Sequence, residues 1–193
     1  VEIVAGADDE QCAGWTWRAL SSAADALHIS APDGARAELH WKLIGSHNAA
    51  NATAAIAAAH HVGVSLDTSV KALASFKGVK RRLELLGKPA GVAVYDDFAH
   101  HPTAIEGTLN ALRAQFEAGK LIAIIEPRSN TMRLGEHKGA LAKCAEAANY
   151  ALWFTPPDLQ WDLGSIVTAC GQEALKSTDA LIERALAVAT PGD

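Results

Sequence analysis

Residues 92–103 read V-A-V-Y-D-D-F-A-H-H-P-T, and this stretch decides the fold. Its first four residues are apolar, β-branched or aromatic and too few for a helix, so they predict a buried strand. Pro102 suits the first turn of a helix, where its missing N–H costs nothing. The apolar residues that follow repeat at helical spacing, at Ile105, Leu109, Leu112 and Phe116. The prediction is a strand, a polar loop and a helix, an arrangement whose loop binds ligands in open α/β sheets.

The composition is that of a globular protein. The chain has 193 residues, 49% of them hydrophobic and 20% charged, enough for one large domain or two small ones. The net charge of −5 argues against a nucleic-acid partner. No apolar run approaches the roughly 20 residues of a bilayer span, so we expect no membrane segment. The three cysteines, Cys12, Cys144 and Cys170, lack metal or redox spacing and predict free thiols in a reducing cytoplasm.

The first part of the chain predicts a β-rich region followed by two helices. The expected strands are residues 1–5, 15–20 and 37–44, with Pro32-Asp33-Gly34 forming a turn between the last two. The alanine-rich run 49–59 predicts a helix, capped by Asn48 or Ser46 and ended by Gly63. A second, short helix is expected to run from Asp67, as its N-cap, to Phe76.

A change of character between residues 75 and 90 predicts a domain boundary, which we place after residue 76. Beyond it, strands and helices alternate, which favours a mostly parallel sheet. The expected strands are 92–96, 121–126 and 150–154. The expected helices are 103–116, 135–148, 163–169 and 178–189, with a polar loop at 127–133.

The Asp96-Asp97 and His100-His101 pairs form the first candidate site. Carboxylates and imidazoles are ordinary metal ligands, and a carboxylate here could instead accept the hydroxyls of a ribose. Adjacent residues at a strand end point to opposite faces, so only one of each pair can face a common site. Loop and helix-cap roles remain the structural alternative.

Three further groups have both a functional and a structural interpretation. The basic run 77–82 could bind a nucleotide phosphate or be a solvated linker. Asn48 and Asn51 share one helical face near a helix start, although Asn48 alone suits an N-cap. The segment 126–131, E-P-R-S-N-T, follows a strand and places an arginine where it could bind a carboxylate, and a polar turn would look the same.

Four segments together resemble the Mur ligase family, the ATP-dependent amide-forming enzymes of peptidoglycan synthesis. They read G-S-H-N-A-A-N-A-T-A-A-I-A-A-A, F-K-G-V-K-R-R-L-E, Y-D-D-F-A-H-H-P-T-A-I and E-P-R-S-N-T-M-R-L-G. The resemblance implies an α/β chain: residues 1–76 would be the tail of a central ATPase domain and 77–193 an incomplete Rossmann-like C-terminal domain. The sequence lacks a G-x-x-x-x-G-K-[ST] loop, which cradles a triphosphate, so we expect the chain to be part of a longer protein and inactive alone.

The resemblance also implies substrates. The E-P-R-S-N-T-M-R segment is similar to the branch that joins UDP-N-acetylmuramate to L-alanyl-γ-D-glutamyl-meso-diaminopimelate, with ATP and Mg²⁺, through an acyl phosphate. The branch that adds L-alanine is the alternative. Two readings from other classes stay open: a non-catalytic nucleotide- or peptide-binding module, and a metal-dependent hydrolase built on the Asp and His pairs.

The family's functional positions map onto this sequence by motif. The resemblance assigns His47, Asn48, Asn51, Arg82 and Asp97 to the nucleotide. It assigns Arg128, Ser129 and Asn130 to the peptide substrate. His100 and His101 are carried over as candidate catalytic residues, and no metal ligand is assigned.

Overall fold

The computed structural model describes residues 3–5 and 14–193. The chain divides into two compact units, Val1–Val79 and Lys80–Asp193. The dividing point lies inside the segment 75–90 where the composition changes.

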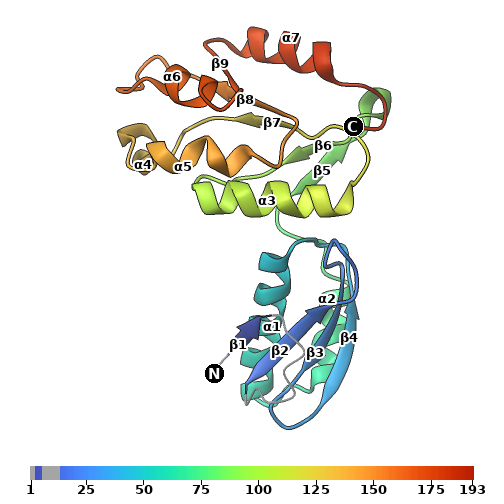
Figure 1. Ribbon diagram of the computed structural model, residues 1–193. Helices are drawn as coiled ribbons and strands as arrows, with labels where there is room; N and C mark the ends of the chain where they lie inside the picture. Colours follow the sequence, from blue (N-terminus) through green and yellow to red (C-terminus); the bar gives the residue numbers. More distant parts are fainter. Residues whose placement is uncertain (1–2, 6–13) are drawn as a thin grey trace. The chain divides into compact units, whose positions relative to one another are not determined.

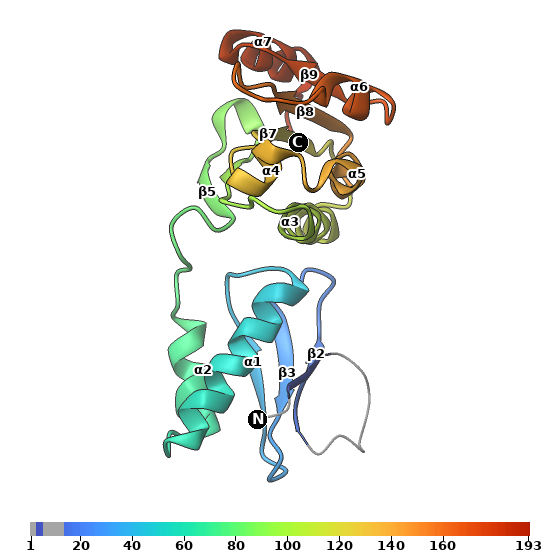
Figure 2. The same ribbon diagram turned by 90° about the vertical axis from the view of Figure 1, so that its left-hand side faces the viewer.

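The first unit is a four-stranded sheet covered by two helices (Figures 1 and 2). The strands are β1 (Ile3–Ala5), β2 (Trp15–Ala19), β3 (Ala26–Ser30) and β4 (Arg36–His40), in that spatial order. β1 runs parallel to β2, and the other pairs are antiparallel. The helices are α1 (Ser46–His61) and α2 (Leu66–Ala74).

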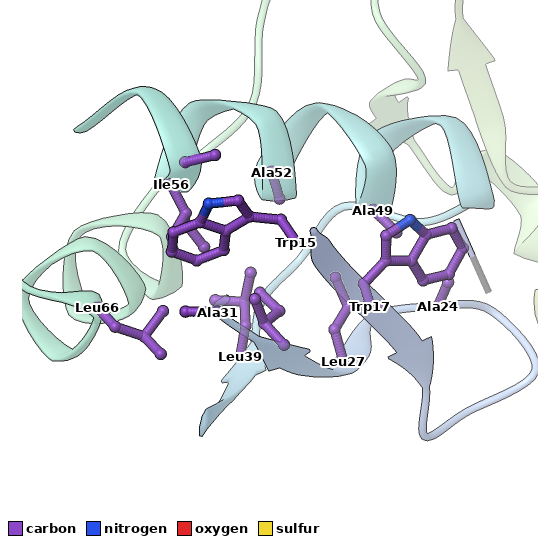
Figure 3. Close-up of a cluster of buried hydrophobic side chains, with 12 residues drawn as sticks. Trp15, Trp17, Ala24, Leu27, Ala31, Leu39, Ala49, Ala52, Ile56 and Leu66 are labelled. Atoms are coloured by element: carbon purple, nitrogen blue, oxygen red, sulfur yellow. The ribbon is translucent and has the colours of Figure 1, made fainter. Parts of the chain in front are cut away.

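The core of this unit lies between the helices and the sheet. Figure 3 shows Trp15 and Trp17 of β2 pointing toward α1, with Leu27 and Leu39 from the neighbouring strands beside them. The alanines of α1 that face the sheet, Ala49, Ala52 and Ala57, are buried. Small side chains on this face let the helix pack closely on the tryptophans, which explains why an alanine-rich sequence belongs here.

Several predictions for the first unit were wrong in detail. The predicted 15–20 strand does not pair through the Pro32–Gly34 turn with the next strand, because an unpredicted strand, β3, intervenes and the turn joins β3 to β4. Gly34 takes the expected positive φ of 86°. Of the predicted strand 1–5, Ile3–Ala5 form β1, whereas residues 1 and 2 lie outside the described residues, as does Cys12.

The predicted helix caps were also wrong. α1 begins after Gly45, and neither Asn48 nor Ser46 caps it. Asn48 lies inside the first turn, and its side-chain amide donates to the carbonyl of Ile44 at 2.8 Å. Ser65, not Asp67, caps α2 by accepting a hydrogen bond from the amide of Thr68. Asp67 instead lies one turn before Lys71 and pairs with it at 2.7 Å.

The second unit contains a hairpin and a parallel sheet (Figure 1). β5 (Glu84–Gly87) pairs antiparallel with β6 (Val94–Asp96), and a short 3₁₀ turn, η1 (Pro89–Gly91), connects them. β7 (Ile122–Ile125), β8 (Tyr150–Phe154) and β9 (Glu173–Leu175) form the parallel sheet in that order. The helical segments are α3 (Pro102–Gln115), α4 (Asn130–Leu134), α5 (Lys138–Leu141), η2 (Lys143–Ala145), α6 (Leu163–Thr168) and α7 (Thr178–Val188).

The core of the second unit lies against the parallel sheet. Trp153 of β8 is fully buried, and its indole N–H donates to the side chain of Gln172 at 2.7 Å. Ile105 and Leu109 of α3 and Met132 of α4 belong to the same cluster. Because Met132 is fully buried, the short helix α4 is anchored to the core and fixes the loop that precedes it.

The mixed α/β fold with a parallel sheet is confirmed, and so are the strands β7 and β8 and the helices α3 and α7. The prediction for β6 was wrong: it pairs with β5 outside the parallel sheet, and Val94 is 39% exposed. The predicted loop 127–133 contains α4, because Ser129 caps a helix there. The predicted helix 135–148 is broken into α5 and η2, and Gly135, with a φ of 76°, ends α4.

Within residues 3–5 and 14–193, no helix combines the length and the apolar character needed to cross a membrane.

Candidate functional site

The carboxylate of Asp97 organises the loop that follows β6. One oxygen accepts the amide of Leu83 at 2.8 Å, and the other accepts the amide of Ala99 at 2.7 Å and the hydroxyl of Thr108 at 3.4 Å. Three separate segments of the unit therefore meet at one side chain. Asp97 holds the start of the hairpin and the first turns of α3 against its own loop.

Asp96, the preceding carboxylate, has a different partner. It pairs with the guanidinium of Arg81 at 3.2 Å. Both carboxylates thus contact the turn 81–83, Asp96 through the side chain of Arg81 and Asp97 through the backbone of Leu83.

The turn 81–83 holds two residues in a conformation that is unfavourable for side chains other than glycine. Arg81 has a φ of 59° and Leu83 a φ of 50°. Three hydrogen bonds fix them: from the amide of Arg81 to Glu84 at 2.9 Å, from the amide of Phe98 to the carbonyl of Arg81 at 2.9 Å, and from Leu83 to Asp97. Backbone strain of this kind persists where surrounding contacts over-determine the conformation, and it concentrates at functional sites.

Phe98 was not among the predicted site residues, yet it links several of them. Its ring centre lies 5.1 Å from the guanidinium carbon of Arg81, 5.8 Å from that of Arg82 and 5.2 Å from the ring of His100. Such cation–π contacts orient the guanidinium groups without neutralising their charge. The signal in the sequence was an aromatic residue between two carboxylates and two histidines.

The two histidines of the loop have distinct contacts. The Nδ1 atom of His100 lies 3.0 Å from the carbonyl of Phe98, and the imidazole is exposed. His101 caps α3, because its Nδ1 accepts the amide of Thr103 at 3.3 Å. A neutral ring that accepts this hydrogen bond carries its proton on Nε2. The His101 ring also contacts the ring of His137, with centres 4.4 Å apart.

The loop after β7 carries the predicted peptide-binding residues. Arg128 and Asn130 are exposed, whereas the hydroxyl of Ser129 is engaged within the fold. It accepts the amide of Met132 at 3.4 Å, which caps α4, and it donates to the carbonyl of His100 at 3.0 Å. The indole N–H of Trp161 donates to the carbonyls of Met132 and Arg133, both at 3.1 Å, and so holds the other end of α4.

These two loops open onto one cavity of about 820 Å³ in the second unit. Asp97, His100 and Arg128 line it together with apolar residues of β7, α3 and α7. Tyr95 also lines it, and burial raises the pKa of its phenol. The structure thus brings predicted nucleotide, catalytic and peptide residues to one cavity.

Three predicted site residues belong to the other unit. His47, Asn48 and Asn51 all lie in the first turns of α1, and Asn51 is exposed. Their predicted contact with the same nucleotide as Asp97 and Arg82 stays a prediction, because the two units are separate bodies. The side chain of Asn48 is already hydrogen-bonded to the backbone.

The described residues contain no group of three or more His, Cys, Asp or Glu side chains placed to hold a metal ion. Arg81 and Arg82 both lie over the ring of Phe98, and Arg81 is also paired with Asp96. The sequence lacks the G-x-x-x-x-G-K-[ST] loop that cradles a triphosphate, so the nucleotide role of these residues stays a prediction.

Residues 81–193, more than half of the chain, match the family model described as the Mur ligase, glutamate ligase domain. The chain belongs to the Mur ligase family. Among curated proteins it is 44% identical over 160 residues to the UDP-N-acetylmuramate–L-alanyl-γ-D-glutamyl-meso-2,6-diaminoheptandioate ligase of Haemophilus influenzae, and 45% identical over 159 residues to that of Escherichia coli. Each match covers 81% of this chain and 35% of the relative, so the chain spans about a third of their length.

Other relatives belong to a second branch. The UDP-N-acetylmuramate–L-alanine ligase of Rhodopseudomonas palustris is 52% identical over 91 residues, which cover 47% of this chain and 19% of that protein.

Solved structures show the same fold. A murein peptide ligase from Psychrobacter arcticus is 38% identical, with a TM-score of 0.68 over 98% of this chain and 41% of that one. The UDP-N-acetylmuramate–alanine ligase of Thermotoga maritima is 25% identical, with a TM-score of 0.73 over 93% of this chain and 40% of that one.

Proposed function

We propose that this chain is part of an ATP-dependent ligase that joins UDP-N-acetylmuramate to the tripeptide L-alanyl-γ-D-glutamyl-meso-diaminopimelate in peptidoglycan recycling. The observation that carries the proposal is the match to two ligases named for these substrates, which extends over 81% of the chain. The match to an L-alanine ligase extends over 47%. Because the substrates are cytoplasmic metabolites of cell-wall synthesis, we propose a cytoplasmic location.

The proposed domain assignment follows the two units. Residues 1–76 would be the C-terminal part of the central ATP-binding domain, and 77–193 the C-terminal domain of the ligase. The family match over 81–193 supports the second assignment. Asn51, Arg82 and Asp97 would then contact the adenosine and one edge of the phosphates.

Asp97 would act on the nucleotide mainly by positioning other residues. Its oxygens already accept three hydrogen bonds, so it has limited capacity for a further ligand. By holding the turn 81–83, it fixes the backbone that carries Arg81 and Arg82. Because Arg81 is paired with Asp96, Arg82 would be the guanidinium that binds an anionic ligand, and its fork geometry suits phosphate.

Arg128 would bind a carboxylate of the tripeptide. It is exposed, it lines the cavity beside His100, and α4 anchors the loop that carries it. A guanidinium can hold a carboxylate with two parallel hydrogen bonds, which sets both affinity and orientation. The tripeptide carries several carboxylates beyond its reacting amine, whereas L-alanine carries one.

In the proposed reaction, the lactyl carboxylate of UDP-N-acetylmuramate would accept the γ-phosphoryl group of Mg-ATP with release of ADP. The peptide amine would then displace phosphate from this acyl phosphate to form the amide. The contribution of this chain would be to orient the acceptor and to stabilise negative charge with its arginines. His100 and His101 are proposed as loop residues close to this reaction. The Nδ1 of His101 caps α3, so its Nε2 is the nitrogen left to face a substrate.

The acceptor specificity separates the two branches. The full-length protein that contains this chain would be incubated with UDP-N-acetylmuramate, ATP, Mg²⁺ and either the tripeptide or L-alanine, and the products identified by mass spectrometry. We expect the tripeptide product to form with much higher kcat/KM. Preferential formation of the L-alanine product would assign the chain to the second branch.

A further inference from the structure

Two contacts join the loop after β6 to the residues on either side of α4. The Ser129 hydroxyl donates to the carbonyl of His100 at 3.0 Å, and the ring of His137, just before α5, packs against that of His101 at 4.4 Å. The loop 97–101 is therefore held by one residue just before α4, Ser129, and one residue after it, His137. The loop after β6 contains a predicted nucleotide residue, Asp97, and the loop after β7 a predicted peptide residue, Arg128.

The hydroxyl of Ser129 has little capacity left for a substrate. Its one proton is donated to His100, and it accepts the amide of Met132, with the Thr131 hydroxyl 3.3 Å away. The prediction that Ser129 faces the peptide thus competes with these internal contacts. A hydroxyl whose donor is committed to a neighbouring loop is better suited to fix that loop than to bind a ligand.

The segments on both sides of the Ser129–His100 hydrogen bond are held by further contacts. Met132 is fully buried and the indole of Trp161 holds the last carbonyls of α4, so the helix cannot follow a moving loop. On the other side, Asp97 ties its loop to the turn 81–83 and to α3. The Ser129–His100 hydrogen bond joins two preorganised pieces, and it sets the distance and direction from Arg128 to the loop of Asp97.

We propose that Ser129 is a positioning residue that aligns the acceptor-peptide loop with the nucleotide-side loop, and that it does not bind substrate. The proposal rests on the proposed ligase function for its kinetic consequence. Misalignment of reacting groups lowers the rate of the chemical step more than it weakens binding. Loss of the hydrogen bond should therefore lower kcat, while Arg128 continues to provide peptide affinity.

The kinetic test uses variants of the full-length protein that contains this chain. Ser129→Ala removes both the cap and the donor, and we expect kcat to fall at least about tenfold while KM for tripeptide and ATP changes less than about threefold. Ser129→Thr keeps the hydroxyl and should restore kcat. Ser129→Asp keeps a good N-cap acceptor but has no proton to donate, so it should show the same kcat loss even where Ser129→Ala folds poorly.

Ser177→Ala is the matched control. Ser177 caps α7 by accepting the amide of Ala180 at 3.2 Å, and α7 follows β9, away from both loops in the sequence. This variant should lose a similar amount of thermal stability to Ser129→Ala but keep its kcat. An equal kcat loss in Ser177→Ala, an unchanged kcat in Ser129→Asp, or a rise in tripeptide KM alone would overturn the proposal.

Amide hydrogen exchange tests, without any assumption about function, whether the Ser129–His100 hydrogen bond holds the loop 97–101. In Ser129→Ala and Ser129→Asp, the amides of the loop 97–101 should exchange faster than in the wild type, and in Ser177→Ala they should not. Unchanged exchange in this loop would show that the hydrogen bond does not hold it. Failure of the wild type to ligate the tripeptide would refute the proposed function and leave this measurement as the test of the link.

Discussion

Replacement of Asp97 by alanine should destabilise the second unit far more than replacement of its neighbour Asp96. Asp97 accepts two backbone amides at 2.8 and 2.7 Å and a hydroxyl at the longer distance of 3.4 Å. A hydrogen bond to a charged group contributes about 1.5–3 kcal/mol. Because the site is partly exposed, we take the lower value for each amide and neglect the hydroxyl, which gives about 3 kcal/mol in the free energy of unfolding.

Asp96 provides the matched control. Its side chain pairs with Arg81, and both side chains are substantially exposed, at 35% for Asp96 and 47% for Arg81. An exposed ion pair contributes about 0–1 kcal/mol. Asp96→Ala should therefore cost less than about 1 kcal/mol, although it removes the same charge from the adjacent position.

Hydrogen exchange of the slowest amides in β8 measures the opening free energy of the second unit, independent of the first. A difference of about 3 kcal/mol corresponds to roughly a 150-fold faster exchange for Asp97→Ala, since 1.4 kcal/mol is tenfold. Equal acceleration in both variants, or less than about fivefold in Asp97→Ala, would refute the structural role assigned to Asp97.

Three further predictions concern other sites. Arg128→Lys should raise the KM for tripeptide about tenfold and leave that for ATP nearly unchanged, because lysine cannot form the paired hydrogen bonds of a guanidinium; equal effects on both substrates in steady-state assays would contradict the assignment. Hydrogen bonds from Arg184 lower the pKa of Glu173. The stabilisation they give is therefore present above the ordinary glutamate pKa of about 4.3 and is lost as the pH falls below it. Arg184→Gln should reduce the pH dependence of the unfolding free energy in that range. Burial raises the pKa of Cys144 to about 12, whereas Cys170 is exposed, so peptide mapping after iodoacetamide treatment of the native chain should find Cys170 modified and Cys144 unmodified.

The elements that could be predicted from sequence are those whose pattern is local and continuous. β8 is the apolar run Tyr150–Phe154, and its bounds were predicted to the residue. α3 begins at Pro102, one residue before the predicted start, with Pro102 in the first turn as predicted, and its apolar stripe is buried at Ile105, Leu109 and Leu112. In these segments propensity, hydrophobic spacing and tertiary packing all favour the same structure.

The errors arose where distant residues decide the structure. β6 resembles a buried strand in isolation, but its partner is β5, ten residues earlier, and that pairing leaves Val94 exposed. β9 has only three residues and gains its strand character from its neighbour β8. α4 was predicted as a loop because its single capping serine gives little signal compared with the fully buried Met132 that anchors it.

In the candidate site, too, local sequence motifs identify some residues, whereas contacts between distant residues are not predicted. The family resemblance assigned Asp97, Arg82 and Arg128, but their partners could not be deduced from spacing. The amide of Leu83 and the hydroxyl of Thr108 reach Asp97 from opposite sides in sequence. His137 reaches His101 across 36 positions, a contact that depends on the break between α4 and α5. Thr108 carries a weak signal, as a polar residue next to the buried stripe of α3.

The most direct test of the central claim is a competition assay with the full-length protein that contains this chain. UDP-N-acetylmuramate, ATP and Mg²⁺ would be supplied with equimolar tripeptide and L-alanine, and the two products quantified by mass spectrometry. The proposed function predicts that UDP-N-acetylmuramyl-tripeptide is the dominant product and that ADP forms in equal amount. Dominance of UDP-N-acetylmuramyl-L-alanine, or ATP consumption without either product, would contradict it.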